Sequence, residues 1–461
     1  MIRLGAFDAE RRWRPRGLAV LPALRDPEGD RTVAAMDELL AAACGPTDLL
    51  ITSAEPPGAL LRTLAAAGLP TRHRVAPAPG PGSRRDAAGP DVTDAANNDA
   101  VTVEQRLLAS PPGDLVEYGI APYAVLPETA ALAGQCAPGS ELPDADTVRA
   151  VSSKTWSNAF VRNHGLPGAG DTVRSVAELH ARITAFDGAT ALVKDPYGVA
   201  GRGTITVSSP RVLRSVTRTL EAQAERGAAV ELLVQRQYEK AADFSAHLEI
   251  APDGTVDWLG VQLMHNTGFS YAGSRPVPEP LARRLAGCGY REVMEKTGAA
   301  LAAAGYHGPV CVDSMTLHDG TLVPVLEINP RMSMGLISLL LGRRLAGAGT
   351  SARLAVRGLR LPATGPGHPR DPAPSSPDDE AGRVSRRYGA LVTALDGQDA
   401  LYRAGGTGVL PLTANTLRSP RARLYYAVVA RDAEQDRLLE DAMDRVARSL
   451  ERTAGEVSHA S

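Results

Sequence analysis

Short apolar runs alternate with amphipathic stretches along the first third of the chain. The runs LAVLPAL at 18–24 and DLLITS at 48–53 have the length of buried strands, and residues 57–67 gather their apolar side chains on one helical face. This alternation predicts a small α/β unit over residues 1–145. Residues 76–99 interrupt the unit with Pro, Gly, Asp and Asn, which is typical of a long surface loop or a disordered insertion.

The pattern changes near residue 143, and a larger unit is predicted over residues 146–350. A helix capped by Asp144 or Asp146 is expected to run past Lys154 towards Phe160, and GLPGAG at 165–170 should end it. The apolar spacing then predicts strands at 191–195, 203–209, 230–238 and 243–250, and helices at 210–226 and 279–304.

Two further apolar runs, 310–318 and 321–329, are joined through Asp319-Gly320, a strong signal for a β-hairpin. A turn centred on Gly320 places Asp313 opposite Glu327, with their Cβ atoms about 4.5–5.5 Å apart. Asn329 lies two residues beyond Glu327 and therefore points to the same side of the sheet. The hairpin should thus present two carboxylates and one amide together.

The remaining chain divides into a linker and a compact C-terminal unit. Residues 351–383 are predicted as the linker because their second half, 363–383, is rich in Pro, Ser and Asp. The last unit, 384–461, has strand candidates ALVTAL and RLYYAVVA and an amphipathic helix at 433–452. No repeat of fixed period is visible. The fold class predicted from these elements is α/β, with mixed α+β character.

Composition and charge narrow the functional classes. A chain of 461 residues corresponds to roughly three domains at about 150 residues each, and 44% apolar with 22% charged residues suits a globular protein. The net charge of −2 argues against nucleic acid as a partner. No apolar run approaches the roughly 18 residues that span a bilayer, so we expect no membrane partner.

Cysteine usage gives no sign of a disulfide framework or a structural zinc site. The four cysteines are scattered and contain no C-x-x-C pair: Cys44, Cys136, Cys288 and Cys311. A reducing, cytoplasmic location is therefore expected. Lysine is also rare, because only four of the 50 cationic residues are lysine: Lys154, Lys194, Lys240 and Lys296. In this background a lysine is a candidate for a position that needs a compact ammonium group.

Two local patterns suggest phosphate and metal chemistry. The predicted hairpin collects Asp313, Glu327 and Asn329, and oxygen ligands of this kind suit Mg²⁺; the alternative is an exposed hairpin edge with a strand that Asn-Pro ends. The stretch ALVKDPYGVAGRGTITV ends a strand at Lys194 and continues into a loop with Gly198, Gly201 and Gly203. Its backbone N–H groups could approach phosphate oxygens, although it is no Walker loop and an ordinary glycine-rich hairpin is the alternative.

The order of these motifs over about residues 150–345 resembles the ATP-grasp ligase superfamily. The resemblance implies an ATP-grasp fold with an N-terminal pre-ATP-grasp domain and a small C-terminal domain. It implies ATP and Mg²⁺ (or Mn²⁺) as cofactors. The ATP ligands that it implies are Lys154, Lys194, Gly198, Gly201, Gly203, Gln235, Gln237, the Tyr238 backbone and, at the ribose, Asp243. The EINPR segment matches as written, which places Asp313, Glu327 and Asn329 on the metal and Arg331 beside the transferred phosphate.

The flanking segments narrow the resemblance further. GIAPYAVLPETAALAG at 119–134 and the compact C-terminal unit look similar to the pheganomycin-type peptide ligases. The expected reaction joins a small-molecule carboxylate to an amine or peptide acceptor through an acyl phosphate, with release of ADP, in specialised metabolite biosynthesis. Polar residues between the hairpin and the hinge, which is the segment with the adenine candidates Gln235, Gln237 and Tyr238, are candidates for the substrate side: His265, Asn266, Ser270 and Arg275. The alternatives are another C–N or C–S ligase and a non-catalytic ATP-binding regulator. A homodimer is the assembly considered.

Overall fold

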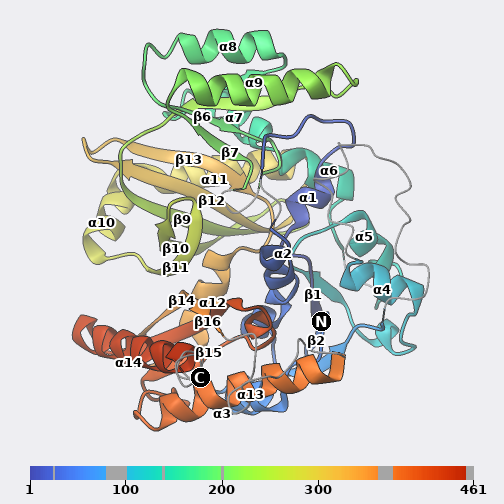
Figure 1. The fold of residues 1–461 in the computed structure, drawn as a ribbon, viewed down its shortest axis with the longest axis vertical. Coiled ribbons are helices and arrows are strands. Elements are labelled where there is room, and N and C mark those ends of the chain that lie inside the picture. Colours follow the sequence, from blue (N-terminus) through green and yellow to red (C-terminus); the bar gives the residue numbers. More distant parts are fainter. Residues whose placement is uncertain (24–25, 79–100, 138–140, 199–201, 362–376, 453–461) are drawn as a thin grey trace, which may run out of the picture.

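The computed structural model of the protein describes residues 1–23, 26–78, 101–137, 141–198, 202–361 and 377–452. Their strands form three sheets: a four-stranded parallel sheet, a four-stranded antiparallel sheet and an eight-stranded antiparallel sheet. Figure 1 shows the antiparallel four-stranded sheet with helices α8 and α9 at one end of the molecule and helices α13 and α14 at the other. Among the described residues, no helix combines the length and the apolar character that crossing a membrane requires.

The parallel sheet has the order β3-β2-β1-β4 and is built from strands of the N-terminal part of the chain, called the N-terminal unit below. Its strands are β1 (Ile2–Leu4), β2 (Leu49–Thr52), β3 (Arg72–Val75) and β4 (Ile120–Pro122). The helices around it are α1 (Ala9–Trp13), α2 (Pro27–Ala34), the 3₁₀ segment η1 (Met36–Ala43), α3 (Gly58–Ala66), α4 (Val103–Ala109), the 3₁₀ segment η3 (Leu115–Glu117) and α5 (Pro127–Ala133). The proposed insertion at 76–99 lies almost entirely outside the described residues.

Residues 18–23 of the apolar run 18–24 do not form a strand, and Leu24 lies outside the described residues. The run contributes one isolated bridge, Leu18 to Ala229, and buries Ala19 and Leu21 in the core of the small antiparallel sheet. The run is apolar because it packs against a neighbouring unit, and periodicity alone does not distinguish this from a strand.

The small antiparallel sheet has the order β5-β8-β6-β7. Its strands are β5 (Asp171–Val173), β8 (Leu232–Arg236), β6 (Ala191–Lys194) and β7 (Thr204–Val207), and its covering helices are α8 (Val176–Thr184) and α9 (Pro210–Ala224). The single helix predicted from residue 144 to 160 is two helices, α6 (Ala145–Val151) and α7 (Lys154–Asn163). The break occurs because Ser153 caps α7, with its Oγ accepting from the Thr155 N–H at 3.2 Å.

The large sheet has the order β13-β12-β9-β10-β11-β14-β16-β15. Its strands are β9 (Lys240–Ile250), β10 (Val256–Thr267), β11 (Ser270–Pro276), β12 (Gly308–Leu317), β13 (Leu322–Asn329), β14 (Ser351–Arg360), β15 (Gly408–Pro411) and β16 (Arg421–Ala430). Its helices are α10 (Glu279–Gly287), α11 (Tyr290–Ala303), α12 (Met334–Leu345), α13 (Pro377–Asp396) and α14 (Ala433–Arg452), with the 3₁₀ segment η4 (Asn415–Leu417). The single helix predicted over 279–304 is therefore two helices, α10 and α11. The break lies at Gly289, whose φ of 74° is in the left-handed region.

The C-terminal part differs from the prediction in two places. Residues 351–360, expected in the linker, form β14, and α13 begins at Pro377 inside the expected linker. The ALVTAL segment belongs to α13 and is not a strand. Because β14 pairs with both β11 and β16, the C-terminal strands extend the sheet that holds the predicted hairpin, and one buried apolar core runs through both.

Candidate active site

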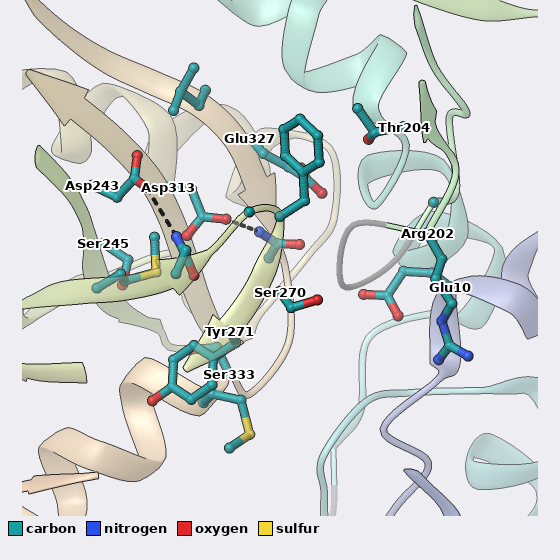
Figure 2. A pocket seen from close by; sticks show the side chains of 18 of the residues that line it. Glu10, Arg202, Thr204, Asp243, Ser245, Ser270, Tyr271, Asp313, Glu327 and Ser333 are labelled. Atoms are coloured by element: carbon teal, nitrogen blue, oxygen red, sulfur yellow. Dashed lines mark hydrogen bonds between the residues drawn. The ribbon is translucent and has the colours of Figure 1, made fainter. Parts of the chain in front are cut away.

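A cavity of about 680 Å³ lies where the three sheets meet. Its lining includes residues from the N-terminal unit, the small antiparallel sheet, the hairpin β12–β13 and the C-terminal strand β16. Thirteen of the seventeen predicted site residues line it: Lys154, Lys194, Gly198, Gln235, Gln237, Tyr238, Asp243, Asn266, Ser270, Asp313, Glu327, Asn329 and Arg331. In Figure 2, Asp243, Asp313 and Glu327 lie on one side of this pocket, and Glu10, Arg202 and Thr204 on the other.

The hairpin β12–β13 brings the predicted oxygen ligands together. Asp313 pairs with Glu327 in the strand register, as expected, and Cys311 pairs with Asn329. A register shift between Asp313 and Met315 separates this part of the ladder from the part near the turn. The amide of Asn329 donates to Asp313 Oδ2 at 3.1 Å.

Two lysines face these carboxylates. Lys154 Nζ lies 2.6 Å from Glu327 Oε1 and donates to the Gly198 carbonyl oxygen, also at 2.6 Å. Burial lowers the pKa of Lys194; Glu327 opposes that shift, and Lys154 adds to it. The pKa of Glu327 is lowered although burial would raise it, because Lys154 and Lys194 favour the carboxylate.

The candidate oxygen ligands have the chemistry of a magnesium site. Burial and the charge of Glu327 raise the pKa of Asp313 to about 7, so two carboxylates are held together in a place where a cation would stabilise both. Two carboxylates with an amide oxygen are the set that Mg²⁺ uses when phosphate and water complete its shell. No cluster of three His, Cys, Asp or Glu side chains suited to a metal occurs within the described ranges.

Arg331 is held by the N-terminal unit. Its Nε donates to Glu10 Oε1 at 2.6 Å, and its guanidinium donates to the Tyr123 hydroxyl at 3.2 Å and lies over that ring. Burial alone would lower the pKa of Arg331, but Glu10 and Tyr123 raise it, so the guanidinium stays charged. Glu10 and Tyr123 also line the cavity, although no local sequence motif marks either residue as part of a site.

The hinge and ribose candidates line the same cavity. The Gln235 amide donates to the Gly168 carbonyl at 2.9 Å, and the Gln237 N–H donates to the Thr190 carbonyl at 2.9 Å. Asp243 accepts from Asn266 at 3.0 Å and is paired with Lys240. The hydrogen bond between Asp243 and Asn266 is drawn dashed in Figure 2.

The glycine loop between β6 and β7 folds tightly on itself. Gly203 has a φ of +86°, and a Cβ at this position would lie 2.9 Å from Gly198 Cα. Gly203 is not part of the cavity wall, so its observed role is to let the backbone turn. Gly201 lies outside the described residues. Asp195, directly after Lys194, pairs with Arg14 and accepts from the Tyr197 N–H at 2.9 Å, an anchor that no local motif signals.

His265 and Arg275 do not line the cavity, whereas Asn266 and Ser270 do. Both His265 and Arg275 are exposed. His265 is outside the cavity because side chains alternate between the two faces of strand β10. Met264 and Asn266 line the cavity, so the side chain between them points to the other face.

No protein-family model matches the chain. A curated relative, butirosin acyl-carrier protein–L-glutamate ligase of Niallia circulans, is 24% identical over 228 residues. The match covers 48% of this chain and 52% of the relative, so the chain spans about half the length of the curated relative that it matches.

Solved structures resemble the chain over most of its length. A biotin carboxylase–ATP-analogue complex from Campylobacter jejuni has a TM-score of 0.51 at 12% identity, over 90% of this chain and 92% of that chain. An N5-carboxyaminoimidazole synthetase from Staphylococcus aureus has a TM-score of 0.49 at 10% identity, over 90% and 95% of the two chains. The likeness to the biotin carboxylase shows that the protein has the ATP-grasp fold, and the fold class predicted from the sequence is confirmed.

Proposed function

We propose that this protein is an ATP-dependent carboxylate–amine ligase that activates a carboxylate as an acyl phosphate and releases ADP and phosphate. The observation that carries the proposal is the convergence of Lys154, Lys194, Asp313 and Glu327 on one cavity. The ATP-grasp fold and the ligase activity named for the curated relative support it.

The proposed reaction needs a cavity that excludes water. A carboxylate is a poor electrophile until it is phosphorylated, and the acyl phosphate is lost to hydrolysis unless water is excluded. In the proposed reaction Lys154 and Lys194 bind the ATP phosphates and stabilise charge on the phosphoryl group during transfer. Gln235, Gln237 and the Tyr238 backbone would bind adenine, with Asp243 at the ribose.

The metal ligands follow from the same hairpin. Mg²⁺ or Mn²⁺ would be held by Asp313, Glu327 and Asn329, and when bound it neutralises phosphate charge. Arg331 would lie beside the transferred phosphate, with Glu10 fixing the orientation of its guanidinium. Activity is expected to require Mg²⁺ or Mn²⁺ and to survive a zinc-selective chelator; full activity in EDTA would contradict this assignment.

The decisive experiment measures whether an oxygen label in the donor carboxylate is transferred to the released phosphate. With ¹⁸O in the donor carboxylate, the label should appear in released phosphate, with one ADP formed per amide and a hydroxamate formed when hydroxylamine replaces the amine. Formation of AMP and pyrophosphate would overturn the acyl-phosphate mechanism. Absence of any nucleotide turnover across a panel of carboxylates and amines would instead favour an ATP-binding regulator.

The substrates proposed are a small-molecule carboxylate donor and an amine or peptide acceptor in specialised metabolism, in keeping with the resemblance to pheganomycin-type peptide ligases. Asn266 and Ser270, which line the cavity, are the substrate contacts proposed from the β10–β11 region. The name of the curated relative supports a second candidate, in which the acceptor is a thiol on a carrier protein. Neutral hydroxylamine distinguishes the two products because it cleaves a thioester and leaves an amide intact.

A further inference from the structure

Strand β16 turns one row of side chains towards the cavity. Arg421, Arg423 and Tyr425 all line it, and the residues between them, Ala422 and Leu424, are buried. The spacing of two residues is that of one strand face, so the two guanidinium groups originate about 7 Å apart on the same side of the sheet. The C-terminal unit therefore adds two cations to a cavity whose phosphate and metal candidates lie on other strands.

On the opposite face of strands β14 and β16, the arginines are paired with carboxylates. Arg353 of β14 pairs with Asp436 at 2.7 Å, and Arg357 pairs with Asp444 at 2.5 Å, both acids from α14. Tyr426 of β16 also donates to α14, to Glu440 Oε2 at 3.1 Å. On the α14 side, each of these polar side chains therefore has a carboxylate partner.

The arginines that line the cavity include some that are paired with a carboxylate and some that are not. Arg331 is neutralised by Glu10, and Arg202 by Asp30 at 2.9 Å. Arg421 and Arg423 are exposed at the cavity wall, and within the described ranges neither forms an ion pair with a carboxylate. The Tyr425 hydroxyl donates to Met36 Sδ at 3.2 Å; burial raises its pKa, and the nearby Arg423 guanidinium opposes that shift. Gly358 stands opposite Arg423 in the β14 register, so no side chain from that position competes for the guanidinium.

We propose that Arg421 and Arg423 form a carboxylate clamp that binds an acceptor carrying a free carboxylate, namely an amino acid or a short peptide. A single guanidinium can give two parallel N–H donors to a carboxylate, and two guanidinium groups on one strand face place a second cation beside the same group. This inference rests on the proposed ligase function and assigns the acceptor class to it.

The test separates acceptor recognition from carboxylate activation. The twenty amino acids and their C-terminal carboxamides serve as acceptors, and hydroxylamine serves as an acceptor without a carboxylate. In Arg421→Ala and Arg423→Ala, we expect KM for free amino acids to rise about tenfold or more and the preference for acid over carboxamide to disappear. Hydroxamate formation from donor, ATP and hydroxylamine should stay within twofold of the unmodified protein. Arg421→Lys and Arg423→Lys should recover part of the affinity.

A matched control is available away from the cavity. Arg226, which follows the end of α9, is an exposed arginine that does not line the cavity, so Arg226→Ala should leave KM unchanged. If the arginine variants keep normal KM while hydroxamate forms, the clamp is wrong and the ligase function stands. If they lose use of a phosphopantetheine thiol acceptor instead, a phosphate-bearing carrier replaces the amino acid. If no variant and no parent forms hydroxamate with any carboxylate, the ligase function itself fails.

Discussion

The surroundings of Lys194 determine the pKa of its ammonium group. Burial lowers its pKa, Glu327 raises it and Lys154 lowers it again, so the ammonium is held beside a carboxylate and a second cation. Such an arrangement destabilises the charged form before any ligand arrives, and an anionic phosphate would reverse that cost.

The first prediction is that Lys194→Ala reduces the rate of ADP formation by about 10²–10³-fold, which corresponds to roughly 3–4 kcal/mol of lost transition-state stabilisation. The melting temperature should change little, because the substitution removes a poorly solvated charge. Lys296→Ala is the control, since Lys296 is an exposed partner of Glu292 on α11. Near-normal ADP release by Lys194→Ala would remove this residue from the mechanism.

At the scale of the element, the break between α6 and α7 is what places Lys154. Ser153 caps α7, so Lys154 occupies its first position, and its backbone N–H donates to the Pro196 carbonyl at 3.0 Å. The ammonium then reaches both Glu327 and the glycine loop. A continuous helix through 144–160 would lack this cap and this contact.

We therefore expect Ser153→Ala to cost about 1 kcal/mol of unfolding free energy and to raise KM for ATP several-fold. Ser175→Ala is the matched variant, because Ser175 caps α8 by accepting from the Glu178 N–H at 3.1 Å and is not part of the cavity lining. It should show a similar loss of stability in denaturant titrations with unchanged KM. Equal KM values in the two variants would show that the cap does not position Lys154.

At the scale of the whole molecule, a buried carboxylate joins the N-terminal unit to the C-terminal unit. Glu38 of η1 accepts from the backbone N–H groups of Ala414 and Asn415 at 2.7 and 3.0 Å and from the Asn415 amide at 2.9 Å. Burial nevertheless raises its pKa to about 8 from an ordinary value of 4.5. Burial also raises the pKa of its neighbour Asp37, to about 6.

This shift gives a pH dependence with a defined sign. Between about pH 4.5 and 8 the folded protein binds more protons at Glu38 than the unfolded chain does, so stability should fall as pH rises through that window. In denaturant titrations from pH 5 to 9, Glu38→Gln should lose stability less steeply than the unmodified protein. The exposed control Glu225→Gln should follow the unmodified slope. Identical slopes for both variants would contradict the assignment.

Much of the candidate site could be predicted because its parts are local. The glycine loop is continuous in sequence, and the hairpin joins two strands that follow one another along the chain. Asp313 nevertheless opposes Glu327 only because the register shifts between Asp313 and Met315, since the pairing of Met315 with Val323 near the turn would set Asp313 opposite Val325. The predicted elements were wrong where the local sequence pattern fits both a strand and a helix. ALVTAL suits either a strand or a helix, and the 20-residue helix around it is set by packing on the core.

Neighbours along the chain were enough to predict the order of the motifs, the hairpin with its candidate oxygen ligands and the strongly amphipathic helices. Which distant groups complete the cavity depends on how the units pack. Glu10 meets Arg331 across 321 residues of sequence, and β16 brings Arg421 and Arg423 to the cavity by joining the large sheet. Strand periodicity fixes which residues share a face, but only the packing of the units decides what that face meets.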